Sequence, residues 1–367
     1  MNMRGLKRLV KIETIKNNLL IKFENKMHML STSYIDGITE SDKVVISQVN
    51  ENIKINDFKL FRENVISSLG LSNEVPVMAT SVNIKNYKIK EREMGGVLIT
   101  ASFEIPNCIY QENLFNAEKG TINIIAWLNH ELTFSGLLDL FRTVTESKCL
   151  SASDLLIRCK SRSSGTSSDG ITVAAKISKN GYMWSGLSTK HGNYISRLIH
   201  ETLISFEENK EKDELLKRSL GLDINGLVEE AIKLYQLAPV PGKDINNIRI
   251  LIKHQINNFL NDPNVWSFII AAREIDLRGE SNTFPFLAKE EYEKDTKRII
   301  ADEALASSLS IYLSGFKGLT ATYWVDSSKD RLNLSISRLP MFEDDIASAL
   351  IGSALSKIYD YLFGGNQ

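Results

Sequence analysis

The sequence predicts an α/β N-terminal domain followed by a mostly α-helical C-terminal domain. β-rich runs mixed with helical patterns extend to about residue 205, a charged stretch follows at Phe206–Glu214, and almost no β pattern occurs beyond Leu220. A chain of 367 residues is also long for one domain. We therefore predict a first domain over residues 1–208, a charged linker over 209–221 and a helical domain over 222–367.

Short aliphatic and β-branched runs predict the strands of the first domain. They are Leu19–Phe23, Val44–Val49, Gly96–Ala101, Ile122–Trp127 and Ile171–Ala175. Helical periodicity predicts helices over Lys59–Leu69, Phe134–Thr145 and Tyr194–Glu208. Strands that alternate with helices indicate a layered α/β structure, in which loops at the ends of the sheet carry the polar groups.

The charged stretch Phe206–Glu214 is compatible with the solvated end of a helix, but the change in composition after it favours a linker. Beyond it, periodic apolar residues predict helices over Ile224–Tyr235, Asn246–Leu260, Pro263–Ile275, Asp295–Phe316 and Glu343–Phe363. Leu319–Val325 and Leu332–Ile336 are possible strands. The second half is therefore predicted to be mostly helical.

Composition narrows the class of protein. A hydrophobic fraction of 43%, a charged fraction of 24% and a net charge of −1 are typical of a soluble globular protein, with no electrostatic case for nucleic acid or an anionic membrane. No apolar stretch approaches the ~20 residues of a membrane span. The odd set Cys108, Cys149 and Cys159 lacks CxxC spacing and predicts reduced thiols in the cytoplasm. A homo-oligomer is left open.

Polar residues interrupt three segments of the first domain in a way that packing does not require. Gly120–Ile125 is an apolar strand with Asn123 inside it, Thr145–Lys148 ends a helix, and Ser164–Asp169 is a loop of small residues that ends in a carboxylate. Asn, Glu, Lys and Asp are costly to bury without partners. These segments therefore predict a functional site.

The run from about Ile99 to Leu203 resembles the adenosylcobinamide amidohydrolases, whose pattern includes GTINI, TEAK and TGTxTD. Here these elements are Gly120–Ile124, TESK at Thr145–Lys148 and SGTSSD at Ser164–Asp169. The turn Thr189–Gly192 matches a TKxG element, and Leu30–Gly37 is similar to the family's first loop. The resemblance implies cleavage of adenosylcobinamide to adenosylcobyric acid and aminopropanol, with no cofactor certain for this domain.

The resemblance and the chemistry of amide hydrolysis together assign expected roles. Hydrolysis requires an activated water or nucleophile, protonation of the amine and stabilisation of an oxyanion. The expected catalytic residues are Glu146, Lys148, Asp169, Ser164 and Thr166, and the expected substrate-binding residues are Asn123, Gly165, Lys190 and His191. The competing interpretations are that Glu146 and Lys148 are surface charges, that Ser164–Asp169 is an ordinary turn and that Asn123 caps a strand.

Two acidic clusters in the helical half predict a second site. Asp302 and Glu303 precede one helix rich in small residues, and Asp344 and Asp345 begin another. Small residues let helices approach closely, so carboxylates from both helices can converge on Mg²⁺ or a similar divalent cation. The alternative is that each cluster complements the positive end of a helix.

Residues from about Leu222 to Tyr361 resemble archaeal α-ribazole phosphatases, relatives of bacterial phosphatidylglycerophosphatase A. The matching pieces include Leu227–Ala231, Asp262–Val265, Ala301–Glu303 and Phe342–Asp345, whereas the family's basic segment is altered at Trp324–Arg331. The resemblance implies dephosphorylation of α-ribazole 5′-phosphate and hence a bifunctional enzyme of cobamide salvage. The alternatives are a degenerate helical domain for dimerisation or regulation, and a corrinoid-binding module without catalysis.

Overall fold

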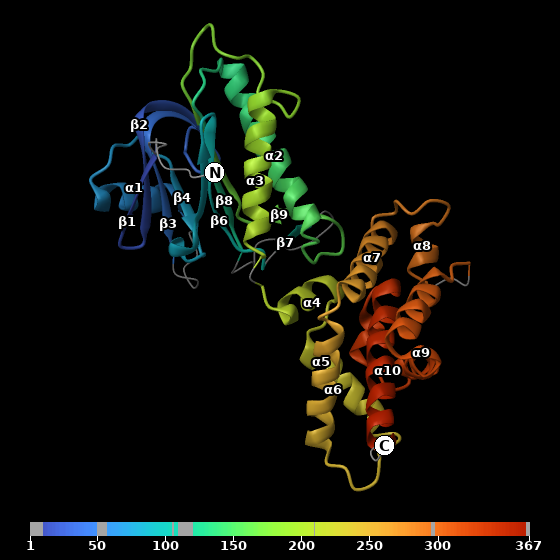
Figure 1. Cartoon of the computed structure of the whole chain (residues 1–367). Helices are drawn as coiled ribbons and strands as arrows, with labels where there is room; N and C mark the ends of the chain where they lie inside the picture. The colour runs from blue at the N-terminus through green and yellow to red at the C-terminus, as the bar shows by residue number, and fades with distance from the viewer. Residues whose placement is uncertain are drawn as a thin grey trace. The chain divides into compact units, whose positions relative to one another are not determined.

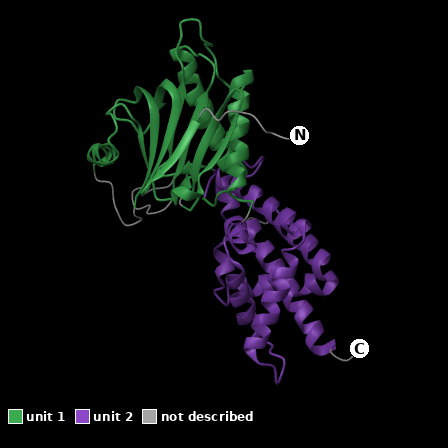
Figure 2. Ribbon diagram, turned by 60° about the vertical axis from the view of Figure 1, so that its left-hand side comes forward, with its two compact units in different colours: residues 1–159, 163–209 green, residues 160–162, 210–367 purple. Residues whose placement is uncertain are grey.

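The computed structural model describes residues 10–49, 57–104, 106–108, 120–208, 210–294 and 298–364. The chain divides into two compact units (Figure 2). The N-terminal unit contains residues 1–159 and 163–209, and the C-terminal unit contains residues 160–162 and 210–367. The predicted start of a helix at Asp295 lies outside the described residues.

A mixed sheet forms the centre of the N-terminal unit (Figure 1). Within the described residues its strands follow the order β4-β3-β2-β10-β8-β6-β5, and β1 pairs with β2. The central strands β8 and β10 run parallel, with Asn123 beside Gly170. The strand bounds are β1 Val10–Ile15, β2 Asn18–Ser31, β3 Ile38–Gln48, β4 Val77–Thr80, β5 Lys88–Arg92, β6 Gly95–Ala101, β8 Ile122–Leu128 and β10 Gly170–Ala175.

Alternation along β8 divides its side chains between two cores. Ile122 and Ile124 pack with the buried apolar residues of α2 (Phe134–Asp154) and α3 (Lys190–Ser205), which cover one face of the sheet (Figure 1). Ile125 and Trp127 join the core on the other face. A third helix, α1 (Phe58–Leu69), packs on strands β3 and β4.

The N-terminal unit also contains a small two-stranded sheet. It pairs β7 (Pro106–Cys108) with β9 (Ser163–Thr166). A disulfide joins Cys108 to Cys159, whose Cα atoms are 6.0 Å apart, so the expectation of three reduced thiols is wrong for this pair. The odd number of cysteines and the absence of CxxC spacing did not reveal this bond, because folding brings together two cysteines that are 51 positions apart. Cys149 remains a free thiol.

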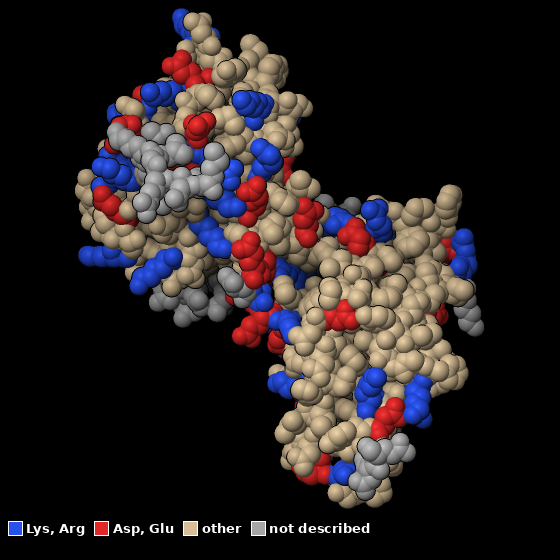
Figure 3. All heavy atoms as spheres, in the orientation of Figure 1, with Lys and Arg blue, Asp and Glu red and all other residues tan. Residues whose placement is uncertain are grey.

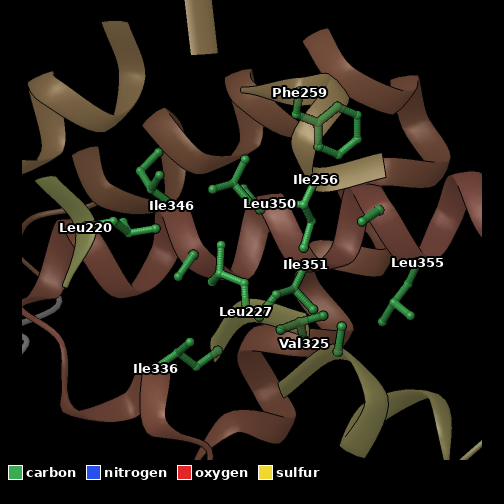
Figure 4. Close-up of a cluster of buried hydrophobic side chains, with 14 of the residues drawn as sticks. Leu220, Leu227, Ile256, Phe259, Val325, Ile336, Ile346, Leu350, Ile351 and Leu355 are labelled. Atoms are coloured by element: carbon green, nitrogen blue, oxygen red, sulfur yellow. The ribbon is translucent and has the colours of Figure 1, made fainter. Parts of the chain in front are cut away.

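The C-terminal unit is a bundle of helices around α10 (Met341–Gly364), which is buried along most of its length. Figure 4 shows Ile346, Leu350, Ile351 and Leu355 of α10 among apolar side chains from neighbouring helices. The other described elements are α4 Lys212–Leu220, α5 Ile224–Tyr235, α6 Ile245–Phe259, α7 Pro263–Glu280, α8 Lys289–Tyr292, α9 Ala301–Lys329 and the 3-10 helix Ser335–Arg338. Thus α4 occupies most of the predicted linker.

The two strands predicted in this half are wrong. Leu319–Val325 lies inside α9, and Leu332–Ile336 runs through a turn into the 3-10 helix. The β-branched residues of the first segment favour a strand locally. Close packing of α9 on α10 overrides that preference. The backbone of Thr322 lies so near Gly352 of α10 that a Cβ on Gly352 would be 2.6 Å from the backbone nitrogen of Thr322.

The helix α9 changes direction at Gly315, whose φ of 65° and ψ of −154° are not helical. A straight helix would separate Asp302 from Asp326 by about 36 Å, at 1.5 Å per residue. The break instead makes α9 two helical halves, both of which reach α10. Glycine suits this position because residues with a side chain rarely adopt such a conformation.

The surface is unremarkable in charge. On the face that Figure 3 shows, acidic and basic side chains are interspersed over the N-terminal unit. Among the described helices, none combines the length and apolar character that crossing a bilayer requires.

Candidate functional site

An ion pair between Lys148 and Asp169 is the centre of the first candidate site. Lys148 lies near the end of α2, and Asp169 immediately precedes β10. Their side chains are 11% and 8% exposed. Because a partly desolvated pair is screened less by water and salt, the two groups hold each other firmly in place.

The carboxylate of Asp169 also accepts several other hydrogen bonds. Oδ1 accepts from the backbone nitrogen of Ile122 at 3.0 Å and from the hydroxyl of Thr166. Oδ2 accepts from the backbone nitrogen of Thr166 at 3.1 Å. Asp169 therefore ties α2, β8 and β9 together, and with its acceptor sites occupied it is suited to positioning Lys148 rather than removing a proton.

Gly165 makes room for this pair. Its φ of 141° is a conformation that side chains disfavour. A Cβ at this position would overlap the carboxylate of Asp169 and lie 2.8 Å from the amine of Lys148. The glycine of the predicted loop is thus explained by close approach, and Ser164 beside it is half-buried on β9.

Asn123 lies at the same end of the strands but on the opposite face of the sheet. Its side chain shares a face with Ile125 and Trp127, whereas Asp169 faces α2. Asn123 is 1% exposed and donates from Nδ2 to the carbonyl of Ala79 at 2.9 Å. The strands β8 and β10 therefore separate Asn123 from the Lys148–Asp169 pair.

Glu146 does not join the pair. Two residues before Lys148, it lies on the exposed face of α2 and makes a 3.8 Å ion pair with Arg142. Residues two apart on a helix point in different directions. The structure thus separates the two residues that the predicted TESK element brought together.

Lys190 and His191 begin α3 and lie at the other end of the sheet. His191 is buried, with Nε2 2.7 Å from the carbonyl oxygen of Trp184 and its ring centroid 4.9 Å from that of Tyr182. The backbone of Tyr182 bonds to the segment just before α2. Further along the two helices, Ser147, the neighbour of Lys148, hydrogen-bonds to Ser196 of α3 at 2.8 Å. His191 lies five residues before Ser196, which is about 7.5 Å along the helix.

The second candidate site collects carboxylates from α9 and α10. One oxygen from each of Asp302, Glu303 and Asp345 lies within 4.8 Å of the others. Asp302 is 3% exposed, and its buried Oδ1 has no hydrogen-bond partner. We call Asp302, Glu303 and Asp345 the open carboxylate group.

A second set of carboxylates shares Asp345. Asp326, Asp344 and Asp345 also lie within 4.8 Å of one another. The amine of Lys329 is 2.7, 2.8 and 3.5 Å from their oxygens in that order. We call these three the lysine-filled carboxylate group. Asp326 was not among the predicted ligands. It lies near the end of α9, in the segment Trp324–Arg331 that was compared with the basic stretch of the phosphatase family.

Burial and mutual repulsion perturb these acids. Burial, and then the neighbouring carboxylate of Glu303, raise the pKa of Asp302 to about 8. Burial and the adjacent Asp344 raise the pKa of Asp345 to about 8 in the same way. A cation bound between such carboxylates would relieve the repulsion and favour their ionised forms.

A buried network fixes the start of α10. Asp276 of α7, 0% exposed, accepts hydrogen bonds from the backbone nitrogens of Phe342 and Glu343 at 3.0 and 2.9 Å. The hydroxyl of Tyr292 donates to it at 2.6 Å. Since Asp344 and Asp345 follow directly, Asp276 determines where they lie. The sequence carried no signal for this contact between distant helices.

The open carboxylate group fits a divalent cation. Mg²⁺ prefers oxygen ligands and retains several waters, so two buried carboxylates and the exposed carboxylate of Glu303 are a suitable set. The unpartnered oxygen of Asp302 supplies an acceptor that the protein itself does not satisfy.

Comparisons with known proteins agree with the first resemblance. A family model described as adenosylcobinamide amidohydrolase matches residues 4–211. An uncharacterized protein of Methanocaldococcus jannaschii, MJ1613, is 26% identical over 216 residues, covering 51% of this chain and 84% of that protein. A second uncharacterized protein of the same organism, MJ1330, is 25% identical over 120 residues, covering 32% of this chain and 91% of that protein.

Two solved structures are also similar to part of the chain. The low temperature requirement C protein of Listeria monocytogenes shares 21% identity and a TM-score of 0.34, over 41% of this chain and 94% of that one. The protein ypjQ of Bacillus subtilis shares 22% identity and a TM-score of 0.34, over 42% of this chain and 96% of that one.

Proposed function

We propose, on the premise that this chain belongs to the adenosylcobinamide amidohydrolase family, that its N-terminal unit hydrolyses adenosylcobinamide to adenosylcobyric acid and aminopropanol. The family match covers more than half of the chain. The observation that carries the proposal is the buried Lys148–Asp169 pair beside Gly165, because these residues come from separate elements of the family pattern and meet in the fold.

We assign Lys148 the task of stabilising negative charge. The ammonium has three donors, and one is directed to Asp169. The remaining donors are suited to a substrate carbonyl whose oxygen becomes negative during attack. Asp169 serves as the positioning residue, because its oxygens are occupied by Ile122, Thr166 and Lys148.

The nucleophile is either water or a hydroxyl. Because the hydroxyl of Thr166 is bonded to Asp169, Ser164 is the better hydroxyl candidate on the same strand, β9. Ser164→Ala separates these routes. A serine nucleophile requires this variant to lose all cleavage and the unmodified protein to accumulate a covalent corrinoid ester, whereas attack by water requires neither.

The direct experiment is mass analysis of adenosylcobinamide incubated with the full chain. We expect adenosylcobyric acid and aminopropanol from the unmodified protein and at least a hundredfold slower cleavage with Lys148→Met, because one oxyanion donor contributes about 10²–10³ in rate. Lys179→Met, which removes an exposed lysine of the same unit, is the matched control and keeps the unmodified rate. Equal rates for the two variants would reject the role of Lys148.

We further propose that the C-terminal unit dephosphorylates α-ribazole 5′-phosphate with a divalent cation, which makes the chain a bifunctional enzyme of cobamide salvage. The observation in favour is the open carboxylate group together with Lys329, since a cation and an ammonium are suited to a phosphate monoester. Phosphate release that is lost with a chelator and with Asp302→Asn would support it. Tight magnesium binding without release would favour a regulatory unit.

A further inference from the structure

The two carboxylate groups of the C-terminal unit differ in what balances their charge. They share Asp345, so they are neighbouring positions for positive charge. Two-metal phosphatases place one cation at each of two such positions. Here the protein itself supplies a positive charge at one position.

Lys329 fills the lysine-filled group. Its amine lies 2.7 Å from Asp326, 2.8 Å from Asp344 and 3.5 Å from Asp345, and its side chain is 13% exposed. Burial disfavours the ammonium, but the carboxylates of Asp344 and Asp326 outweigh burial and raise the pKa of Lys329. A metal ion at this position would have to displace a charged side chain that three acids hold.

The open carboxylate group has no such charge. Among the described residues, no lysine, arginine or histidine forms an ion pair with Asp302 or Glu303. The buried Oδ1 of Asp302 also lacks any hydrogen-bond partner. A buried, unpartnered carboxylate oxygen is costly, and a bound cation removes that cost.

We propose that the C-terminal unit binds one divalent cation per chain, at the open carboxylate group, and that Lys329 keeps a second ion out of the lysine-filled group. This inference extends the proposed phosphatase function and uses its metal site. It places a metal ion and a lysine ammonium on either side of Asp345. Lysine is a compact point charge and is suited to replace the second metal ion beside a phosphate.

Isothermal titration of the full chain with magnesium chloride tests the stoichiometry. We expect one ion for the unmodified protein and two for Lys329→Met, since the methionine leaves three carboxylates without a cation. Lys317→Met is the matched control, because it removes a lysine of the same helix that is 72% exposed and pairs with Asp360, and it is expected to bind one ion. The proposal would be overturned if the unmodified protein bound two ions or none. It would also be overturned if folded Lys329→Met bound only one ion.

Two further variants keep the test decisive if Lys329→Met does not fold. Asp302→Asn is expected to lose the single ion, and Lys329→Arg is expected to bind one ion as the unmodified protein does. An ion that persists in Asp302→Asn would show that it occupies the lysine-filled group and would reject the assignment. Phosphate release is measured separately. A protein that binds one ion but releases no phosphate would reject the phosphatase function and leave this inference standing.

Discussion

Removing either member of the Lys148–Asp169 pair is expected to loosen the ends of the central strands β8 and β10 as well as to stop catalysis. Breaking a buried ion pair costs about 3–5 kcal/mol. In Lys148→Met, Asp169 retains the donors of Ile122 and Thr166, so we expect a loss near 3 kcal/mol. In Asp169→Asn the ammonium loses its partner and the new amide group faces backbone donors, so we expect about 4 kcal/mol.

The double variant gives the coupling between the two residues. Once one member is absent, the second substitution removes no pair, so the combined loss should fall short of the sum by about 2 kcal/mol. Two compact units make a single unfolding curve ambiguous. Amide hydrogen exchange of peptides from β8 and β10 in the full chain measures the local free energy instead. Losses that add within about 0.5 kcal/mol would refute the pair as an interacting unit.

The remaining predictions concern other features of both units. Glu146→Ala should keep the rate of amide cleavage within about twofold of the unmodified rate, since the carboxylate is exposed and pairs with Arg142. A loss of rate as large as that of Lys148→Met would instead support the catalytic role that the sequence predicted for Glu146. Gly315→Ala should lower the midpoint of thermal unfolding of the C-terminal unit, at a cost of about 1–3 kcal/mol for a strained backbone, and an unchanged midpoint would contradict the role of the break. Reduction with dithiothreitol should lower the free energy of unfolding by up to about 4 kcal/mol, because the disulfide closes a loop of 51 residues. The stability of Cys108→Ser should not respond to the reductant, whereas Cys149→Ser should respond as the unmodified protein does. Three free thiols before reduction would contradict this expectation. Burial raises the pKa of Asp302 and Asp345 to about 8, so the folded, metal-free protein holds protons that the unfolded chain releases near pH 4. The melting temperature should therefore fall as the pH rises from about 4 to about 8, and it should fall less steeply in saturating magnesium. A melting temperature that rises over this range would contradict the pKa shifts.

Hydrophobic periodicity predicted the long buried elements well. Ile224–Tyr235 forms α5 with the predicted bounds, and Glu343–Phe363 lies within α10. Short polar strands were missed: β5, with the sequence KIKER, has no apolar run, and its place comes from pairing with β6. Such edge strands are specified by tertiary pairing rather than by local composition.

The candidate site was predicted in part. The order of the motifs indicated that Lys148, Gly165 and Asp169 belong together, and the fold brings them into contact. The position of Asn123 on the other face follows from the period of two along β8, in which Ile122 and Ile124 pack against the helices. The spacing of Glu146 from Lys148 likewise indicated different helix faces.

Topology explains what spacing did not predict. Both α2 and α3 begin at one end of the sheet, so Lys190 and His191 lie there, whereas Lys148 lies at the far end of α2. In the C-terminal unit, the convergence of Asp302 with Asp326 depends on the change of direction at Gly315, and one glycine in a helical pattern does not reveal such a break.

The most direct test of the central claim is the mass spectrum of adenosylcobinamide after incubation with the purified full chain. Adenosylcobyric acid and free aminopropanol, formed by the unmodified protein and lost in Lys148→Met, are the predicted result. Adenosylcobinamide that binds to the folded protein yet is recovered intact would contradict the claim.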